Sequence, residues 1–429
     1  MYDLAIIGAG WAGFNAALKA RKCGLTVALI DKSEIGGTCL NLGCIPTKTL
    51  IQSAKVFNLV KKAALFGINA ALPEADLNRV QERKEKIVEQ LRAGMRSMLR
   101  DIELISGEAR LESRTEIKIG AKTISAKNIL IASGSQPYEL PQFKFDGQKI
   151  ISSNEALALK SVPGSLLIIG GGVIGCEFAG LFASFGSRVT VAEKMPQLLP
   201  GEDKEAAKKL EAVFKKKGIR VNTAVDAASL NIADFERVLV CVGRRPRTEG
   251  LGLEDVGLRS EQARIITDEY LRTNIDNIYA AGDCASKIML AHYAGWQGRL
   301  AGENIAFPGR RKSAGSAVIP NCIFTDPEMG SVGLSEEKAL AAGLEIAAHK
   351  FDFTGSGMAR ILDEADGFIK VIADRRSGKV YGGSIIGPKA TELIGIITLA
   401  VTHSLSIEDL RQTIFAHPTL SETITQSLE

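Results

Sequence analysis

A chain of 429 residues is too long for a single hydrophobic core, so we expect about three domains. Hydrophobic residues make up 45% of the chain and charged residues 24%, as in an ordinary globular protein. The formal net charge of only +4 argues against nucleic acid or an anionic membrane surface as a partner.

The N-terminal region predicts a dinucleotide-binding unit. An apolar run at residues 4–7 has the character of a buried parallel strand, and Gly8-x-Gly10-x-x-Gly13 follows it. A helix is expected to about Lys22, and a second strand at residues 26–30 ends at Asp31. The glycines would let a pyrophosphate approach the helix N-terminus, and the acid would accept a hydrogen bond from a ribose hydroxyl.

Two cysteines, Cys39 and Cys44, lie five residues apart just after this unit. We interpret them as a redox-active disulfide placed against a bound flavin. On a regular helix five residues advance about 7.5 Å, whereas the Cα atoms of a disulfide lie roughly 4.4–6.8 Å apart. Cys39 should therefore lie at or before the first turn, or the helix must be distorted with the help of Gly36, Gly37 and Gly43. The spacing alone leaves two buried free thiols as an alternative.

The next stretch predicts two helices and then several strands. Helices are expected at residues 47–66 and 77–102, the second with apolar residues at helical spacing among many charges. Strand signals follow at residues 103–105, 110–111, 116–119 and 128–132, and the last of these runs into a turn at 133–137.

A second dinucleotide-binding unit begins with an apolar strand at residues 166–169. Gly170-x-Gly172-x-x-Gly175, a helix to about Phe185 and a strand at 188–192 lead to Glu193. The first glycine and the acid are 23 positions apart here, as they are in the first unit, so we infer two copies of one unit and two bound dinucleotides. A carboxylate at this position favours NAD over NADP, although Lys194 beside it weakens that preference slightly.

The rest of the chain predicts the end of this α/β region and then a separate α+β domain. A strand and turn are expected at 238–246, a strand at 277–283 and a helix at 290–306. From about Ser313 strand-like segments alternate, and two helices follow; these elements are expected at 317–319, 367–373, 380–386, 389–403 and 406–414.

The cysteine pattern indicates a reducing compartment. Seven cysteines, scattered apart from one pair, do not form a secreted disulfide framework, and the five others are interpreted as buried fillers. A strand starts almost at Met1, so we expect no signal or transit peptide and a cytoplasmic location. The most membrane-like segment, 166–185, contains Glu177 and five glycines, which favours a buried strand–turn–helix. No metal site is predicted.

These motifs closely resemble one family, the pyridine nucleotide–disulfide oxidoreductases. The form of residues 39–48 is similar to that of the lipoamide-specific branch, and the chain lacks the C-terminal cysteine pair of mercuric reductases. The resemblance covers nearly the whole chain and is carried by both glycine patterns and by residues 37–48, 281–283, 290–292, 325–328 and 417–422.

The resemblance implies an α/β fold of two Rossmann-like dinucleotide-binding domains followed by a C-terminal α+β dimerisation domain. The FAD-binding domain would be discontinuous, with residues 1–145 and 264–312. The NAD-binding domain would span 146–263, and the interface domain 313–429.

The resemblance also implies which residues contact the two cofactors. Asp31 and the first glycine loop would hold the ADP half of FAD, Asp283 its ribityl or pyrophosphate region, and the backbone near 290–292 the pyrimidine edge of the flavin. The expected FAD contacts are Gly8, Gly10, Gly13, Asp31, Lys32, Gly37, Thr38, Lys48, Ser133, Gly134, Asp283, Leu290, Ala291 and His292. The expected NAD contacts are Gly170, Gly172, Ile174, Gly175, Glu193 and Gly243.

The catalytic roles follow from the same resemblance. Cys44 would be the thiolate beside the flavin, Cys39 the thiol that exchanges with the substrate, and Lys48 would pair with Glu177 near the reacting flavin nitrogen. A thiol reacts as its thiolate, so a base speeds exchange, and a histidine oriented by a carboxylate is the usual base. His417 and Glu422 would fill this role for the disulfide of the other subunit, with a cis bond before Pro418, so the active enzyme would be a homodimer.

The implied reaction is the oxidation of a protein-bound dihydrolipoyl group, in a 2-oxo acid dehydrogenase or glycine cleavage complex, with reduction of NAD. Two departures qualify it: Phe415 replaces a histidine that is frequent in the lipoamide branch, and the connection at 222–237 is short, which leaves the affinity for NAD open. Another NAD(P)H-dependent disulfide or mercuric-type reductase is the enzymatic alternative. A flavin-bearing scaffold is the alternative of another class, and the intact Cys39, Cys44 and His417 argue against it.

Overall fold

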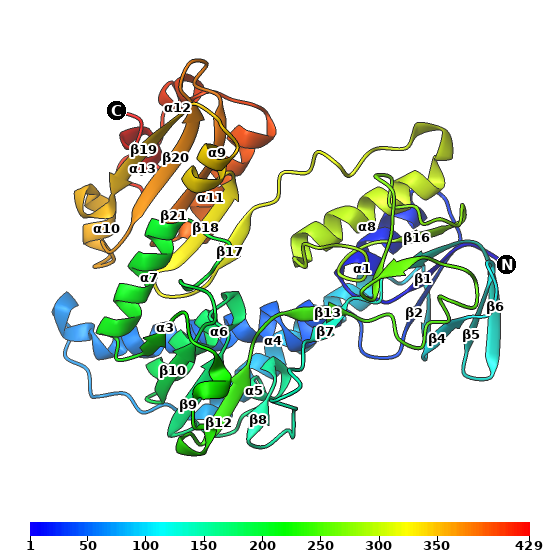
Figure 1. Cartoon of the computed structure of the whole chain (residues 1–429), viewed down its shortest axis with the longest axis horizontal. Helices are drawn as coiled ribbons and strands as arrows, with labels where there is room; N and C mark the ends of the chain where they lie inside the picture. Colours follow the sequence, from blue (N-terminus) through cyan, green and yellow to red (C-terminus); the bar gives the residue numbers. More distant parts are fainter.

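The computed structural model describes all residues from 1 to 429 and contains three sheet-based regions (Figure 1). The first sheet and its helices lie at one end of the molecule, the second sheet lies at the other end, and the C-terminal sheet packs above the second. None of the helices combines the length and the apolar character needed to cross a membrane.

The first sheet is built around the N-terminal strand β1. It has the order β3-β2-β1-β6-β5-β4, and β16 adds parallel to β6, so a strand from far along the chain completes it. The inner positions of β1 are apolar and buried because helices cover the sheet. The bounds are β1 Tyr2–Ile7, β2 Val27–Asp31, β3 Glu103–Ser106, β4 Ala109–Leu111, β5 Glu116–Ile119, β6 Lys122–Ile131 and β16 Ile278–Ala280.

Helices α1 (Trp11–Lys22) and α8 (Ala291–Ala306) cross in close contact beside this sheet. Glycines allow that approach: a Cβ on Gly298 would lie 2.0 Å from the carbonyl oxygen of Ala12, and one on Gly295 would lie 2.8 Å from the Trp11 ring. The packing fixes the start of α8, which carries the predicted cofactor contacts at 290–292, next to the first glycine loop.

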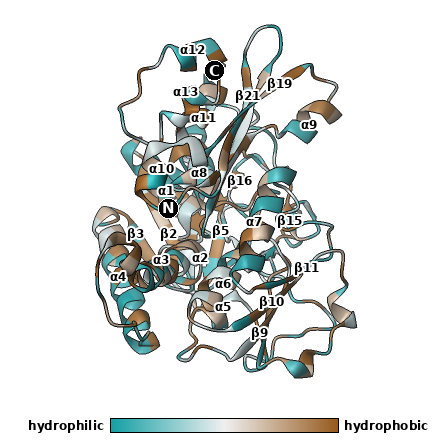
Figure 2. Cartoon of the chain, turned by 90° about the vertical axis from the view of Figure 1, so that its left-hand side faces the viewer, coloured by the Kyte–Doolittle hydropathy of each residue, from teal (hydrophilic) through white to brown (hydrophobic).

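The predicted helical region after the first unit is confirmed, with an interruption. The helices are α2 Gly37–Leu42, α3 Cys44–Lys61, the short 3₁₀ turn η1 Ala63–Phe66 and α4 Leu77–Met98. Asp76 caps α4 by accepting hydrogen bonds from the backbone N–H groups of Asn78 and Arg79. Figure 2 shows hydrophilic and hydrophobic turns mixed along α4, as expected for a helix with one face on the protein.

The second sheet repeats the parallel arrangement of the first, in the order β11-β10-β9-β12-β8. Its elements are β8 Ile150–Ile151, α5 Ser153–Ala156, β9 Ser165–Ile169, α6 Val173–Ser184, β10 Arg188–Ala192, α7 Lys204–Lys216, β11 Arg220–Asn222 and β12 Arg237–Val240. The short connection between β11 and β12 contains two 3₁₀ turns, η2 Ala227–Ser229 and η3 Ile232–Asp234, and no strand.

Two short strands join the two repeats: β7 (Ser135–Pro137) follows the first sheet and pairs in antiparallel fashion with β13 (Arg244–Pro246), which follows the second. The flanking bonds are reciprocal, since Tyr138 N donates to Gly243 O at 3.0 Å and Arg247 N donates to Gly134 O at 2.9 Å. The two equivalent segments thus meet about a local pseudo-twofold axis.

The boundary between the two nucleotide-binding regions is best placed from the packing. Leu251 and Leu253 lie in the hydrophobic core of the first sheet, and Leu111 N donates to the Leu251 carbonyl oxygen at 2.9 Å. We therefore propose that the segment after about residue 247 belongs with the FAD-binding region, together with the hairpin of β14 (Ser260–Glu261) and β15 (Arg264–Ile265). The other predicted boundaries stay predictions.

The C-terminal region is an antiparallel sheet of order β17-β18-β21-β20-β19, with α11 packed on β18 and β21. The strands are β17 Asn321–Ile323, β18 Glu328–Gly333, β19 Ile346–Asp352, β20 Phe368–Asp374 and β21 Val380–Gly387. The helices and 3₁₀ turns are η4 Pro308–Arg310, α9 Glu336–Ala341, η5 Phe353–Gly355, α10 Gly357–Ile361, α11 Ala390–Thr402, α12 Ile407–Arg411 and α13 Thr423–Gln426.

The prediction for this region was partly wrong. No strand forms at 317–319, where the side chains are only half-buried and Pro320, which has no N–H to donate, follows. The predicted helix at 406–414 ends at Arg411. Strands β18 and β19 were not predicted because β18 is broken by glycines and β19 alternates with charged residues.

Helix α3 lies where all three regions meet. Leu50 and Ile51 of α3 share one hydrophobic cluster with Phe178 of α6, Ile323 of β17 and Phe368 of β20. A residue on the first turns of α3 is therefore positioned by every region of the molecule at once.

Candidate active site

The first glycine loop has the geometry that the sequence predicts. Gly8 has φ +107°, and a Cβ there would lie 2.3 Å from the Ala132 carbonyl oxygen, while a Cβ on Gly13 would lie 1.8 Å from the Gly8 carbonyl oxygen. The Asp31 carboxylate accepts hydrogen bonds from Ala9 N at 2.6 Å and Ser33 N at 2.8 Å. The loop is thus held tightly and leaves no room for other residues at these positions.

This region fits the ADP half and pyrophosphate of FAD. Gly10, the N-cap residue of α1, provides no side-chain cap, so the first N–H groups of the helix can bind an anion. A Cβ on Gly134 would meet open space, and the neighbouring Ser133 hydroxyl oxygen is buried without a partner. An unpaired buried hydroxyl beside open space is suited to a polar ligand.

The redox segment resolves the spacing problem by breaking the helix between the cysteines. Cys39 lies in α2, Gly43 interrupts the helix with φ −150° and ψ −116°, and Cys44 is the first residue of α3. A Cβ on Gly43 would lie 2.8 Å from the Thr38 carbonyl oxygen, so the break itself requires glycine. The expected distortion of the helix is confirmed.

The segment is also fastened to the first glycine loop. Gly36 N donates to the Ala9 carbonyl oxygen at 2.9 Å. A Cβ on Gly37 would lie 2.6 Å from the Gly10 Cα atom. The cysteines are therefore held at a fixed position relative to the loop that would bind FAD.

Both cysteines carry free thiols in this structure and share a side-chain hydrogen bond. The hydrogen bond from Cys39 is the main cause that lowers the pKa of Cys44 to about 7, against the opposing effect of burial, with Lys48 contributing in the same direction. The same bond and burial raise the pKa of Cys39. Cys44 is thus the more acidic thiol of the pair, which is consistent with the predicted thiolate beside the flavin. The role of Cys39 as the thiol that exchanges with the substrate stays a prediction.

Lys48 and Glu177 form the predicted ion pair, with 2.7 Å between Nζ and Oε2. The Glu177 side chain is only 3% exposed, and its second oxygen accepts from Phe324 N at 3.0 Å. The Lys48 ammonium also lies 4.9 Å from the centre of the Phe324 ring. Lys48 stands one helical turn after Cys44, so the pair is placed beside the thiolate.

Asp283 is part of a chain of contacts that sequence reasoning did not find. It accepts a hydrogen bond from the Ser135 hydroxyl at 2.5 Å, and Ser135 in turn accepts from Arg244 Nε at 2.8 Å. Burial raises the pKa of Asp283, while Ser135 and Arg244 act in the opposite direction. Asp283 follows β16 and is bonded to Ser135, which comes directly after Ser133 and Gly134; its contact with FAD stays a prediction.

The second glycine loop reproduces the first. Gly170 has φ +105°, a Cβ on Gly175 would lie 1.9 Å from the Gly170 carbonyl oxygen, and a Cβ on Gly172 or Gly243 would meet open space. Glu193 accepts from Gly171 N at 2.6 Å and from Met195 N at 2.7 Å. Helix α6 has no side-chain cap at Gly172, so the region fits a second dinucleotide.

The remaining predicted contacts differ in how well they are placed. Leu290 is the uncapped N-cap of α8, and His292 Nε2 donates to the Pro320 carbonyl oxygen at 2.8 Å. Ile174 is half-buried in the first turn of α6. Lys32 is exposed and pairs with Glu108 at 2.6 Å, so its side chain is not brought into the site.

His417 and Glu422 form the predicted pair at the C-terminus. His417 Nδ1 donates to Glu422 Oε2 at 2.9 Å, and this bond lowers the pKa of Glu422. The tautomer that donates from Nδ1 leaves Nε2 free to accept a proton. The peptide bond before Pro418 is cis, as expected. The His417 side chain is 80% exposed and makes no hydrogen bond to either cysteine of its own chain.

The prediction that the five other cysteines are buried is confirmed for three of them and wrong for two. Cys176, Cys241 and Cys284 are buried, whereas Cys23 and Cys322 are half-buried. Burial raises the pKa of Cys176, Cys241 and Cys284, so these thiols stay protonated and unreactive near neutral pH.

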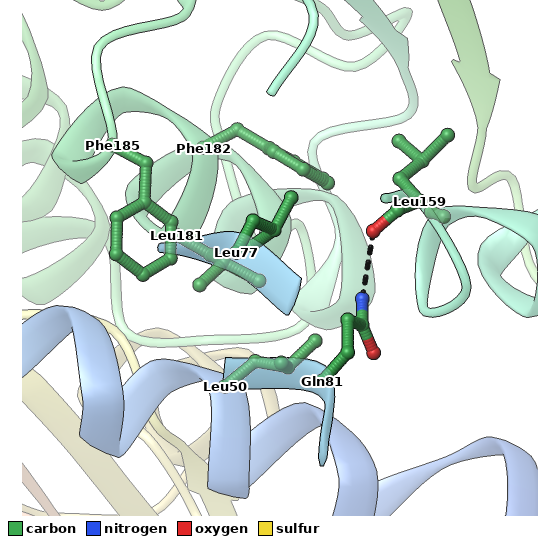
Figure 3. Close-up of a pocket in the computed structure, with 8 residues that line it drawn as sticks. Leu50, Leu77, Gln81, Leu159, Leu181, Phe182 and Phe185 are labelled. Atoms are coloured by element: carbon green, nitrogen blue, oxygen red, sulfur yellow. Dashed lines mark hydrogen bonds between the residues drawn. The ribbon is translucent and has the colours of Figure 1, made fainter. Parts of the chain in front are cut away.

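A small apolar pocket lies away from these groups, among α3, α4, α5 and α6 (Figure 3). Gln81 is its one polar lining residue, and it donates to the Leu159 carbonyl oxygen at 2.8 Å. No titratable side chain lines it, so we assign it no role in the chemistry.

Besides Arg244, two side chains escaped the sequence reasoning. Asn41, between the cysteines, donates to the carbonyl oxygens of Ile35 and Gly37 at 3.0 Å and accepts from Arg92 Nη2 at 2.9 Å. These bonds tie α2 to α4. The position of Asn41 inside the redox segment was the only available signal, because Arg92 reaches it from 51 residues away.

Comparison with known families gives two matches that together span nearly the whole chain. The family described as pyridine nucleotide-disulphide oxidoreductase matches residues 2–298, and the dimerisation domain of the same family matches residues 319–428.

Curated relatives are similar over their full length. Dihydrolipoyl dehydrogenase from Bacillus subtilis is 39% identical over 450 aligned residues, which cover 99% of this chain and 97% of the relative. Dihydrolipoyl dehydrogenase from Chlorobaculum parvum is 38% identical over 452 residues, which cover 99% and 96%. These alignments are longer than the 429-residue chain, so the relatives contain segments that this chain lacks.

Solved structures share the same fold. LpdA from Mycobacterium tuberculosis has a TM-score of 0.91 and 29% sequence identity, covering 99% of this chain and 98% of that one. The HOCl-induced flavoprotein disulfide reductase RclA from Escherichia coli has a TM-score of 0.89 and 29% identity, covering 100% and 99%.

Proposed function

This chain belongs to the pyridine nucleotide–disulphide oxidoreductases, a family of flavin- and nicotinamide-dependent enzymes, and from that premise we propose that it is a dihydrolipoyl dehydrogenase. Its substrate would be a protein-bound dihydrolipoyl group, and NAD the electron acceptor. The observation that carries the proposal is the thiol pair of Cys39 and Cys44, with an acidic thiol held next to an ion pair, combined with an exposed histidine oriented by a carboxylate.

The dithiol substrate would reduce the Cys39–Cys44 disulfide in two thiol–disulfide exchange steps. One thiolate of the substrate attacks the Cys39 sulfur, which forms a mixed disulfide and releases Cys44 as its thiolate. The second substrate thiol then attacks the mixed disulfide, which closes the lipoyl disulfide and releases Cys39. The substrate is thereby oxidised by two electrons, and the cysteine disulfide is reduced to two thiols. His417 Nε2 takes the proton of the attacking thiol, and Cys39 ends protonated, as its raised pKa requires.

The protein prepares the reduced pair for its next oxidation. FAD, when bound, accepts the two electrons of the dithiol and delivers a hydride to NAD. Cys44 is held ionised by the Cys39 hydrogen bond and by Lys48. Glu177 keeps the Lys48 ammonium fixed, and Phe324 covers it. The ion pair joins the two regions, since Lys48 comes from the first region and Glu177 from the helix of the second glycine loop, and the two loops would hold the two dinucleotides.

We further propose that each site takes its base from a second copy of the chain. The dimerisation-domain match supports a homodimer. The His417 side chain is 80% exposed, although it already bonds Glu422, which suits a group that works on another subunit. The lipoyl-bearing partner would belong to a 2-oxo acid dehydrogenase or glycine cleavage complex. The cytoplasmic location stays a prediction.

The test is steady-state turnover of dihydrolipoamide with NAD, for the wild-type protein and for Cys44→Ser and His417→Ala. Both variants are expected to lose nearly all activity, because one removes the thiolate and the other the base, and general bases contribute about 10²–10⁴-fold. Cys241→Ser, which changes a buried thiol of the second region, is the matched control and should turn over like the wild type. Normal turnover by Cys44→Ser would contradict the mechanism.

Co-expression of the two inactive variants tests the shared site. In a mixed dimer of Cys44→Ser and His417→Ala subunits, one site combines an intact cysteine pair with an intact partner histidine. Mixed dimers, isolated with two different tags, are therefore expected to regain roughly half of the wild-type rate if the two sites work independently. Mixed dimers as inactive as their parents would show that the base comes from the same chain.

A second enzymatic function has one observation in its favour. Phe415 stands where the lipoamide branch often has a histidine, and it packs half-buried on the C-terminal core. A changed substrate channel would suit another disulfide or a metal ion as acceptor. Turnover of NADH or NADPH with glutathione disulfide or Hg²⁺, exceeding that with lipoamide, would favour this function over the first.

A further inference from the structure

Arg244 occupies a particular place in the internal repeat of this protein. It is the first residue of β13 and directly follows Gly243, as Ser135 follows Gly134 in the first unit. In the antiparallel pairing of β7 with β13, Arg245 lies opposite Gln136 and Arg244 opposite Pro137, so the Arg244 side chain reaches Ser135 diagonally across the two strands. Arg244 Nε donates to the Ser135 hydroxyl at 2.8 Å, and Arg244 Nη2 donates to the Ser135 carbonyl oxygen at 2.9 Å.

The guanidinium of Arg244 also reaches the redox segment. Its Nη2 lies 3.4 Å from the hydroxyl of Thr38, the residue immediately before Cys39. One side chain of the NAD-binding region thus contacts both Ser135, which donates a hydrogen bond to Asp283, and the start of α2. The cysteine helix is otherwise fixed only by its own region, through Gly36, Gly37 and Asn41.

The charge of Arg244 is poorly compensated by the protein. The side chain is half-buried and forms no ion pair, since its contact with the nearest carboxylate, Asp283, passes through the Ser135 hydroxyl. Burial lowers the pKa of Arg244, and the like charge of Arg247 acts in the same direction, while Asp283 and, less strongly, Cys44 act in the opposite direction. A desolvated cation without a direct partner is costly unless an anion forms near it.

We propose that Arg244 is a positioning residue for the redox centre, which fixes Thr38 and the Ser135–Asp283 pair from the neighbouring region and supports the Cys44 thiolate with its positive charge. It acts alongside Lys48, which is closer to Cys44 in the sequence and also lowers the pKa of that thiol. The NAD-binding region then adjusts the acidity of a thiol in the FAD-binding region through one side chain. The inference rests on the proposed redox role of Cys44.

The experiment measures the pH midpoint of the long-wavelength charge-transfer absorbance of the reduced holoenzyme, which reports the Cys44 thiolate. The wild-type midpoint is expected near the Cys44 pKa of about 7. Arg244→Met should raise it by roughly half a pH unit, equivalent to about a threefold loss in the ionisation constant. Arg244→Lys keeps the charge and should restore most of the shift. Arg245→Met is the matched control, because Arg245 is exposed, lies next along β13 and pairs with Glu249 at 3.1 Å.

Two results would contradict the proposal. A midpoint of Arg244→Met equal to that of Arg245→Met overturns the proposal, and a lysine variant that behaves like the methionine variant overturns the electrostatic part. If Arg244→Met yields no folded holoenzyme, Arg244→Gln replaces it and is judged by the same two results. The absorbance does not depend on the disulfide substrate, so a failure here leaves the proposed dihydrolipoyl dehydrogenase activity untouched, and the reverse also holds.

Discussion

The two dinucleotide-binding units share nearly the same local structure but continue differently after the acid. The first glycines have φ +107° and +105°, and Cβ atoms on Gly13 and Gly175 would approach carbonyl oxygens to 1.8 and 1.9 Å. Asp31 and Glu193 each accept a backbone N–H of their glycine loop at 2.6 Å. The nucleotide-binding frame is therefore the same structure twice.

The segment after the acid distinguishes the two units. In both, the carbonyl oxygen of the second loop residue accepts a backbone N–H from that segment: Gly36 N donates to Ala9 O at 2.9 Å, and Leu199 N donates to Gly171 O at 2.8 Å. In the first unit the segment then becomes α2 with its cysteines. In the second it leads to Asp203, the N-cap of α7, which is bound by Lys370 of the C-terminal sheet at 3.1 Å.

The segment that this hydrogen bond holds against the glycine loop thus contains the redox cysteines in the first unit and forms an interdomain contact in the second. The glycines and the acid are constrained by the nucleotide, so they tolerate little change, while the following segment is free to take on a separate task. The two units also contact each other through the pairing of β7 with β13 and through the ion pair of Lys48 with Glu177.

The largest effect is expected from adding a methyl group to the closest glycine of each loop. Gly13→Ala and Gly175→Ala both place a Cβ within 2 Å of a carbonyl oxygen, so the backbone must shift at the pyrophosphate site. Each should lower turnover by more than about 100-fold, since a displacement of about 1 Å can cost that much. Gly13→Ala should purify with little FAD, whereas Gly175→Ala should keep FAD and lose NADH binding; absorbance and NADH titration measure these.

Gly180→Ala is the control for this pair, because it adds the same methyl group to α6 in open space. It should bind both cofactors normally. Loss of FAD from Gly175→Ala to the same extent as from Gly13→Ala would mean that the two units do not bind independently.

A smaller effect is expected from breaking the ion pair of Lys48 with Glu177, which joins the two units. Lys48→Met removes a cation that lowers the Cys44 pKa and leaves the buried Glu177 without its partner. A rise of about one unit from the value of about 7 would reduce the thiolate population at pH 7 roughly fivefold. The pH midpoint of the charge-transfer absorbance checks this. Lys55→Met, on the same helix and paired with Glu328, should leave the midpoint unchanged.

The lowered pKa of Cys44 also predicts how the stability of the reduced protein changes with pH. The folded pKa of Cys44, about 7, lies below its ordinary value of 9.0, so its ionisation stabilises the folded dithiol protein fully above pH 9. That stabilisation is lost as the pH falls through 7. Melting curves of the reduced wild-type protein should therefore show a larger loss between pH 9 and pH 7 than those of Lys48→Met. Equal losses in both would contradict the assignment.

The sequence was informative where function depends on local backbone geometry. The glycine loops, the acids and the break beside Gly43 could be predicted because a positive φ or a close approach requires glycine there. Arg244 could not be predicted from a pattern, since its contacts depend on the pairing of β7 with β13, about a hundred residues apart. For the same reason the C-terminal strands were only partly found: β18 and β19 owe their conformation to partners in the sheet more than to their own alternation.

The smallest effect on turnover is expected from the contact that follows the second acid. Lys370 is buried and bonds Asp203, Glu205 and Glu336. Burial lowers its pKa, but the carboxylates of Glu205 and Asp203 outweigh this effect and raise it. Lys370→Met leaves Asp203, only 1% exposed, without its cation and should cost about 3–5 kcal/mol of stability. Turnover well below the melting transition should stay near that of the wild type, because no group of the thiol centre is touched.

Lys209→Met is the matched control across the same boundary between α7 and the C-terminal sheet. Its partner Asp366 is 58% exposed, so that pair should contribute about 0–1 kcal/mol and less at high salt. Thermal melts and turnover measurements of Lys370→Met and Lys209→Met test whether the segment after Glu193 serves stability or catalysis. If Lys370→Met lost turnover in proportion to Cys44→Ser while keeping its melting temperature, the segment after Glu193 would take part in the chemistry, and the division of tasks between the two units would be wrong.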